Sequence, residues 1–198
     1  LLDKMDVKDI YLGEPIDGLT QAVLRCGAWQ DWQWDGVNFE FVKHSGGKTR
    51  TGNNASCVLR IDADGASMLL TGDIEKELEI ELLSSGQTLS ANLLIAPHHG
   101  SNTSSSSEFI RSVVPAEVVF SAGRNNHYGH PTAAVTQRYQ RFGARCWSTA
   151  YHGSMRFKLA NSAATIDQIW GGSRYYWQTA PNSTASMAEM CSNLQSER

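Results

Sequence analysis

The sequence contains no long apolar run. None of its 198 residues belongs to an apolar stretch approaching the ~18 residues that a membrane-spanning helix needs, and no basic-then-apolar signal segment opens the chain. We therefore expect no membrane span within these residues. Because the chain begins with Leu1 rather than Met, we interpret it as a piece of a longer protein whose upstream part is out of view.

Cysteine is scarce, and no two cysteines form a C-x-x-C pair. The four are Cys26, Cys57, Cys146 and Cys191. This spacing argues against a zinc site made of cysteines. Two interpretations remain open: buried thiols, or one disulfide if the domain faces an oxidising compartment such as the periplasm.

A long stretch of the chain lacks acidic residues. No Asp or Glu occurs from Val118 to Ile166, although the whole chain has a net charge of −3. The cations of this stretch are Arg124, Arg138, Arg141, Arg145, Arg156 and Lys158, with His127, His130 and His152. Such segregation predicts a positive field suited to an anionic substrate. An ordinary solvated basic face is an equally weighted alternative.

The length and composition predict one globular domain with a sizeable core. The chain is 41% hydrophobic and 19% charged. We expect a domain over residues 1–177 and a polar, loosely ordered tail over 178–198. Hairpin strands come first and strands alternating with helices follow, which predicts an α/β fold with a mixed sheet and helices outside it.

Local patterns predict several elements. Asp35-Gly36 predicts a hairpin turn, and Asp62-Ala63-Asp64-Gly65 predicts the connection of a second hairpin. Ser105-x-x-Glu108 predicts a capping box. Pro131 suits the first position of a helix, which places His130 at the predicted N-cap. Further expectations are a helix end at Leu1–Met5, a strand at Lys8–Leu12, a helix at Ile16–Arg25, a hairpin of Arg145–Thr149 with Ser154–Leu159, a closing strand at Ile166–Trp177, and core packing of Trp29, Trp32 and Trp34 in preference to base stacking.

Two short apolar runs end in residues that can bind a metal. Ser67–Leu70 leads through Thr71-Gly72 to Asp73, and Asn92–Ala96 leads through Pro97 to His98-His99. Two buried strands of this kind deliver their following residues to one edge of a sheet. Carboxylate and imidazole together suit zinc or manganese. Asp73 could instead cap the following helix, and the histidines could be ordinary loop residues.

Four motifs in order resemble a known family. They are Asn53–Arg60 (NNASCVLR), Leu69–Asp73 (LLTGD), Pro97–Ser101 (PHHGS) followed by Thr103–Ser106, and Gly123–Pro131 (GRNNHYGHP). Together they resemble the C-terminal metallo-β-lactamase-like domain of the ComEC family of bacterial DNA-uptake channel proteins. The resemblance extends over residues 1–177 and implies an αβ/βα sandwich.

The resemblance also implies a chemistry. It is metal-dependent hydrolysis of a phosphodiester in incoming DNA during natural transformation, with two divalent ions, zinc or manganese, in the intact domain. By motif position, Asp73 and His99 would bind metal, and His130 and His98 would be catalytic. Substrate contacts would come from Arg124, Asn126, Ser101 and Asn54.

The superfamily's first metal motif, H-x-H-x-D-H, is absent from these residues. The resemblance therefore implies an N-terminally truncated domain that binds few or no metal ions and is inactive as a fragment. His44 lies near another ligand position, but we interpret it as a strand-end histidine. The expected partners are DNA and a membrane channel domain upstream in the same polypeptide, with this domain soluble and periplasmic beside the inner membrane.

Two other functions stay open. The domain could be a non-catalytic module that guides DNA or gates the channel through its basic half. It could also hydrolyse another phosphoester, such as phosphorylcholine on a cell-wall polymer. An intact H-x-H-x-D-H motif upstream would favour the nuclease over the guiding module, and membrane spans upstream would argue against the phosphorylcholine esterase.

Overall fold

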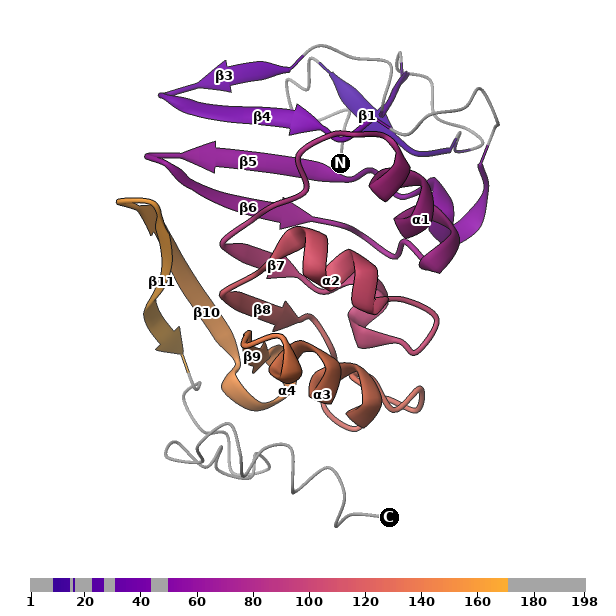
Figure 1. Ribbon diagram of the computed structural model, residues 1–198, viewed down its shortest axis with the longest axis vertical. Coiled ribbons are helices and arrows are strands. Elements are labelled where there is room, and N and C mark those ends of the chain that lie inside the picture. Colours follow the sequence, from indigo (N-terminus) through magenta and orange to yellow (C-terminus); the bar gives the residue numbers. More distant parts are fainter. Residues whose placement is uncertain (1–8, 15, 17–22, 27–30, 44–49, 171–198) are drawn as a thin grey trace.

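A seven-stranded mixed sheet forms the centre of the computed structural model, which describes residues 9–14, 16, 23–26, 31–43 and 50–170 (Figure 1). Its strands lie in the order of the chain: β3 (Trp32–Trp34), β4 (Val37–Phe41), β5 (Leu59–Ala63), β6 (Ala66–Leu70), β7 (Leu93–Ile95), β8 (Glu117–Phe120) and β9 (Arg145–Ser148). Neighbours from β3 to β6 are antiparallel, and neighbours from β6 to β9 are parallel. The predicted mixed α/β sheet is confirmed.

The antiparallel half is built from the two predicted hairpins. Residue pairs Trp34–Val37 and Ala63–Ala66 face each other across two-residue turns. Asp35-Gly36 has φ values of 49° and 77°, and Asp64-Gly65 has 49° and 74°. Positive φ at both positions is the type I′ turn that Asp-Gly favours, because its twist matches that of the strands.

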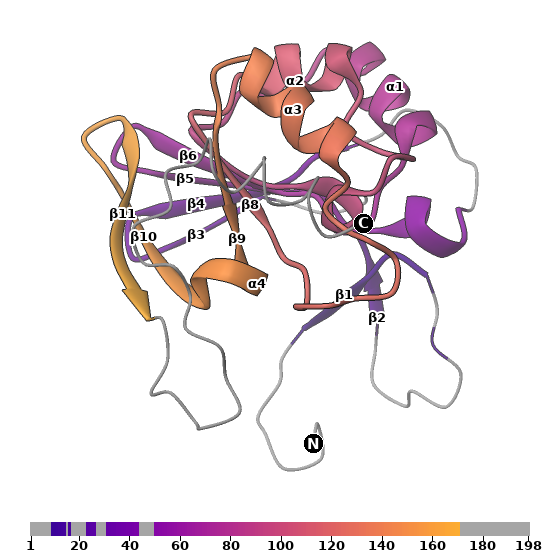
Figure 2. The same cartoon turned by 90° about the horizontal axis from the view of Figure 1, so that it is seen from below.

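Three helices cover one face of the sheet (Figure 2). They are α1 (Lys76–Ser84), α2 (Ser107–Val113) and α3 (Ala133–Arg141), and they connect the parallel strands. Alternate strand residues, including Leu69, Leu94 and Phe120, are buried against helix residues such as Phe109 and Tyr139. This layer is the larger part of the core, because each crossover helix buries its apolar side on the sheet.

The hairpin of β10 (Ser154–Ala160) and β11 (Ala163–Trp170) lies on the other face, with the short helix α4 (Thr149–His152) (Figure 2). Leu93 and Val119 are buried there beside Ala164, and Phe157 packs against them. Strands β7 and β8 are thus covered on both faces, which explains why their sequence is continuously apolar rather than alternating.

The final hairpin differs from the expected one. Strand β9 pairs with β8 in the large sheet, and β10 pairs with β11. The pairing follows burial, since Met155, Phe157 and Leu159 pack over the apolar face of the large sheet, to which Trp147 of β9 contributes, rather than extending beside β9.

Another difference lies near the start. Val23–Arg25, expected in a helix, is the strand β2, parallel to β1 (Ile10–Leu12). A disulfide from Cys26 to Cys57 and a hydrogen bond from Cys26 N to Leu12 O (3.2 Å) hold this segment extended. A long-range crosslink has overridden local helix propensity.

Two helix starts are each shifted from the predicted residue. Ser106, not Ser105, caps α2, because its Oγ accepts from Phe109 N (3.3 Å). The buried Glu79 carboxylate accepts both the Ser105 and Ser106 amides, which fixes the turn one residue later. Thr132 occupies the cap of α3, so the interpretation of His130 as its cap is wrong.

Trp32 packs against other aromatic rings, since it stacks on Phe39 (centroids 4.9 Å apart) and lies 6.0 Å from Tyr11, but it is 37% exposed and is not a core residue. Trp34 is 74% exposed on the edge strand, so its predicted core packing is wrong. The predictions for Leu1–Met5, Trp29, His44 and the tail fall outside the described residues. In the ranges that are described, no helix is both long and apolar enough to cross a bilayer.

Candidate active site at the carboxyl ends of the parallel strands

Strands β6 and β7 deliver the two predicted metal ligands to one place. Leu70 and Ile95 are register partners in parallel strands, so the residues after them leave from the same sheet edge. His99 Nε2 lies 3.4 Å from Asp73 Oδ1. The prediction that the two runs place Asp73 and the histidines at one edge is confirmed.

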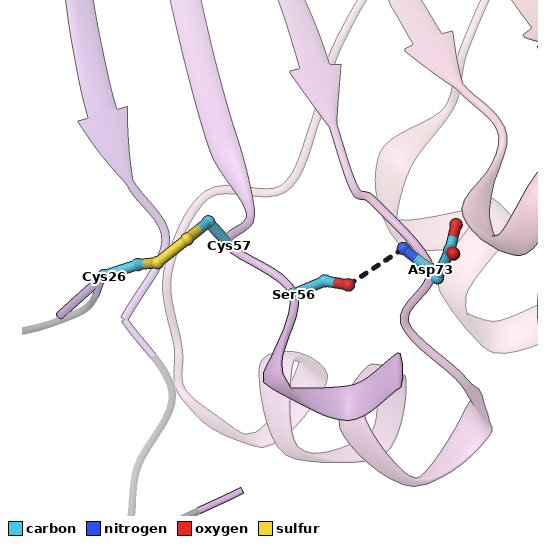
Figure 3. The surroundings of a disulfide bond; sticks show 4 residues. All are labelled: Cys26, Ser56, Cys57 and Asp73. Atoms are coloured by element: carbon cyan, nitrogen blue, oxygen red, sulfur yellow. Dashed lines mark hydrogen bonds between the residues drawn. A yellow bond between two sulfur atoms is a disulfide. The ribbon is translucent and has the colours of Figure 1, made fainter. Parts of the chain in front are cut away.

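Asp73 is held through its backbone. Its N–H donates to Ser56 Oγ (3.0 Å), and Cys57, which follows Ser56 in the chain, forms the disulfide with Cys26 (Figure 3). Gly72 has φ +57°, and a Cβ there would lie 2.7 Å from the Ser56 Cβ. Glu75 takes the N-cap position of α1, so the interpretation of Asp73 as the helix cap is wrong.

The backbone of the histidine pair is left-handed. His98 has φ 48° and His99 has φ 56°. Such a conformation costs a non-glycine residue about 1 to 3 kcal/mol, and it persists only where surrounding contacts impose it. One such contact runs from His98 N to Gly72 O (3.0 Å) and joins the two loops. Two consecutive strained histidines indicate a functional site.

A polar network holds the His98 ring. Its Nδ1 lies 3.2 Å from Thr103 Oγ1 and 3.4 Å from Glu75 Oε1. Thr103 Oγ1 donates to Glu75 Oε1 (2.9 Å), and Ser101 Oγ lies 3.1 Å from Thr103 Oγ1. Sequence reasoning missed Glu75 and Thr103. The available signal was a glutamate just before the helix, where Ser or Asp caps better.

His130 reaches the same site from the loop after β8. Its ring centroid lies 5.8 Å from that of His98, at 68°. Asn126 accepts from His130 N (2.9 Å) and donates to His130 O (2.7 Å), which closes the loop behind the ring. Burial lowers the pKa of His130, and charge on His98 and His99 lowers it further. A histidine kept neutral in this way can accept a proton.

The other predicted site residues lie around this group. Asn54 Oδ1 accepts from Glu75 N (2.8 Å), and Ser101 is buried beside Thr103. Arg124 is exposed in the turn that precedes Asn126. The structure therefore brings Asp73, His98, His99 and His130 together, with Asn54, Ser101 and Asn126 bracing their loops. Direct contacts of these residues with a substrate stay predictions.

In the folded chain, acids from outside the acid-free stretch lie next to some of its arginines. Arg145 pairs with the buried Glu117, and Arg156 pairs with Asp167 (2.6 Å), both acids lying just outside the stretch. Arg138 Nη1 donates to Ser105 O (2.6 Å). Arg138, Arg145 and Arg156 thus have partners within the fold, which favours the solvated-face alternative for this part of the surface.

The described residues do not by themselves make a metal centre. Within these ranges, no group of three or more His, Cys, Asp or Glu side chains is arranged so that it could hold a metal ion. Asp73 and His99 provide two donors of the kinds that zinc and manganese accept, where a catalytic zinc takes three from the protein. The fit to a metal is partial.

Comparison with known proteins gives a consistent assignment. No protein-family model matches the chain. Competence protein ComA of Neisseria gonorrhoeae is 39% identical over 173 residues, which cover 87% of this chain and 24% of that protein. ComE operon protein 3 of Bacillus subtilis (strain 168) is 39% identical over 114 residues, covering 58% and 15%. Recombination protein 2 of Haemophilus influenzae is 33% identical over 144 residues, covering 72% and 18%.

This chain spans about a quarter or less of the length of these relatives. Over the residues that match, it belongs to the ComEC family of competence proteins.

Proposed function

We propose that the chain forms part of a metal-dependent phosphodiesterase that hydrolyses DNA during uptake in natural transformation. The observation that carries the proposal is the convergence of Asp73, His99, His98 and His130 from the ends of three neighbouring parallel strands. This is the edge at which open α/β sheets bind ligands. The names of the relatives support a role in competence.

Metal dependence is proposed on the chemistry of the donors alone. Asp73 and His99 would hold an ion together with donors from outside the described residues. A bound divalent ion would polarise the phosphoryl oxygen and acidify a water. Since two donors do not complete a site, we assign no reaction step to the metal. The chain's own part is to place His98 and His130 beside that position.

Within this proposal, His130 is the proton-transferring group. Its ring is partly buried and its pKa is lowered, so the neutral base is the dominant form at neutral pH. Arg124 and the neighbouring loop would contact phosphate without reading the base sequence.

We also propose a periplasmic location beside a membrane channel of the same polypeptide. The Cys26–Cys57 disulfide supports it, because such bonds persist in oxidising compartments. The low fraction of the relatives' length that this chain covers leaves room for a channel domain in them.

The test uses a longer version of the protein that spans the full length of the relatives. We expect it to cleave duplex or single-stranded DNA when manganese or zinc is supplied, and Asp73→Ala to abolish cleavage. Asp31→Ala, at an exposed carboxylate before β3, is the matched control and should leave the rate unchanged. Both variants should bind DNA about equally, because the loss is in chemistry rather than in affinity.

Two results would count against the proposal. If Asp73→Ala cleaved DNA at the rate of the parent protein, the edge would not be the active site. If the parent bound DNA tightly in a salt-dependent manner and never cleaved it, the non-catalytic guiding module would be the better function.

A further inference from the structure

The His98 ring contacts two oxygen atoms through one nitrogen. Nδ1 lies 3.2 Å from Thr103 Oγ1 and 3.4 Å from Glu75 Oε1. Among the described residues, no hydrogen bond to Nε2 is found. The ring is thus held from one side only.

Both oxygens act as acceptors toward His98. A carboxylate such as Glu75 has no hydrogen to donate. Thr103 has one hydroxyl hydrogen, which goes to Glu75 Oε1 at 2.9 Å. A hydrogen on His98 Nδ1 therefore satisfies the arrangement, whereas a lone pair there would face two electron-rich oxygens.

The surroundings fix Glu75 in this orientation. Asn53 Nδ2 donates to the same Oε1 (3.3 Å), and Asn54 Oδ1 accepts from Glu75 N (2.8 Å). The N-terminus of α1 is tied to the loop as well, because Lys76 N donates to Thr103 O (3.0 Å). Glu75 makes no capping hydrogen bond to its own helix, so its carboxylate is left to contact Asn53, Thr103 and His98.

We propose that Glu75 and Thr103 are positioning residues that hold neutral His98 as the Nδ1–H tautomer, so that Nε2 presents its lone pair to the site as a base. The inference rests on the proposed function for its purpose, but the tautomer itself does not. In water a neutral histidine side chain favours the other tautomer, with its hydrogen on Nε2. The imposed form therefore has a structural cause, as in sites where a carboxylate orients a ligating histidine.

The test is nitrogen NMR of the present chain with 15N-labelled histidine, at mildly alkaline pH where imidazole is neutral. In the parent chain we expect His98 to show a protonated Nδ1 and an unprotonated Nε2. Glu75→Ala should shift His98 to mainly Nε2–H, and Thr103→Val should shift it in the same direction. Glu75→Gln retains an acceptor oxygen and, unlike Glu75→Ala, should keep His98 in the Nδ1–H form.

Glu77→Ala is the control, since Glu77 is an exposed carboxylate in the same first turn of α1. It should leave the His98 signal unchanged. A parent chain with His98 mainly Nε2–H, or a Glu75→Ala spectrum identical to that of the parent, overturns the proposal. If Glu75→Ala failed to fold, Thr103→Val and Glu75→Gln would still decide it, because each keeps the size and shape of the side chain it replaces.

The outcome is independent of catalysis. If the His98 tautomer depended on Glu75 but the longer protein never cleaved DNA, the proposed function would be wrong and the positioning role of Glu75 and Thr103 would stand. If the longer protein cleaved DNA but His98 were in the Nε2–H form, the proposed function would stand and the positioning role would be wrong.

Discussion

The two ends of the central strands place left-handed backbone on different residues. At the hairpin end, the two tight turns between antiparallel strands place positive φ on Asp35-Gly36 and Asp64-Gly65, residue types that tolerate it. At the site end, positive φ falls on two consecutive non-glycine residues, His98 and His99, where it costs free energy. The hairpin end is locally self-consistent, whereas the site end is held in place by distant parts of the chain. Function accumulates where the local preferences are overruled.

The largest expected effect comes from reducing the disulfide, which supports the site end and not the hairpin end. Cys26 and Cys57 are 31 residues apart in sequence, and opening a loop of that size lowers the free energy of unfolding by about 3.5 kcal/mol. We expect this loss in urea unfolding with and without reductant. The Asp73 amide, which donates to Ser56, should also exchange faster with solvent.

A double variant, Cys26→Ser with Cys57→Ser, serves as the control and should not respond to reductant. Equal stability of the oxidised and reduced chain would show that the crosslink does not support the site end.

The second test places a methyl group at each end. Gly100 has φ +85°, and a Cβ there would lie 2.6 Å from Pro131 and 2.7 Å from Phe120. Gly36 has φ +77° with nothing within 4 Å. Gly100→Ala should therefore cost about 3 kcal/mol through strain and overpacking, and Gly36→Ala about 1 kcal/mol through strain alone. Urea denaturation measures both, and equal losses would contradict the difference between the ends.

The third test compares Gly with Ala at one position in each region, where the difference in stability should have opposite signs. At His99, whose side chain is about half exposed, Gly should give a more stable protein than Ala by about 1 kcal/mol, because Gly adopts φ 56° freely. At Asn38, an exposed position in β4, Ala should be the more stable by a similar amount. Thermal unfolding of the four variants checks the reversal. Ala more stable than Gly at both positions would mean that His99 is not strained.

The smallest expected effect is pH-dependent. Burial lowers the pKa of His152, at the site end after β9, and a hydrogen bond between His152 Nδ1 and the backbone oxygen of Ser148 opposes that shift. Between the lowered pKa and the ordinary value of about 6.5, the unfolded chain binds more protons than the folded chain, so stability rises with pH through this window and falls as pH drops through it. His152→Gln should flatten this dependence, as followed by urea midpoints across pH.

His127→Gln, at an exposed histidine, provides the control and should keep the slope of the parent. His130 contributes a slope of the same sign, so some dependence should remain in His152→Gln. If the slope of stability against pH were unchanged in His152→Gln, His152 would have the same pKa in the folded and unfolded chains.

Much of the fold and the centre of the site were predictable from sequence. The Asp-Gly turns and the continuous apolar runs depend on neighbouring residues, so they could be read along the chain. Asp73 and the His98-His99 pair were predicted because they follow buried apolar runs, and the choice of His99 as the metal ligand came from the family resemblance. Glu75 and Thr103 were missed, because their roles depend on contacts 23 to 28 residues away in the chain, between His98 and Glu75 and between Thr103 and Glu75.

The sequence by itself determined the strand order from hairpins to crossovers and the identity of the residues at the strand ends, since both follow from local pattern and chain polarity. Only the tertiary structure decided the strand conformation of Val23–Arg25, the pairing of β10 with β11, and the neutralisation of the basic stretch by Glu117 and Asp167. A disulfide, an apolar sheet face and ion pairs each join segments distant in sequence. Their free energies exceed the propensities of a few residues, so local pattern cannot anticipate them.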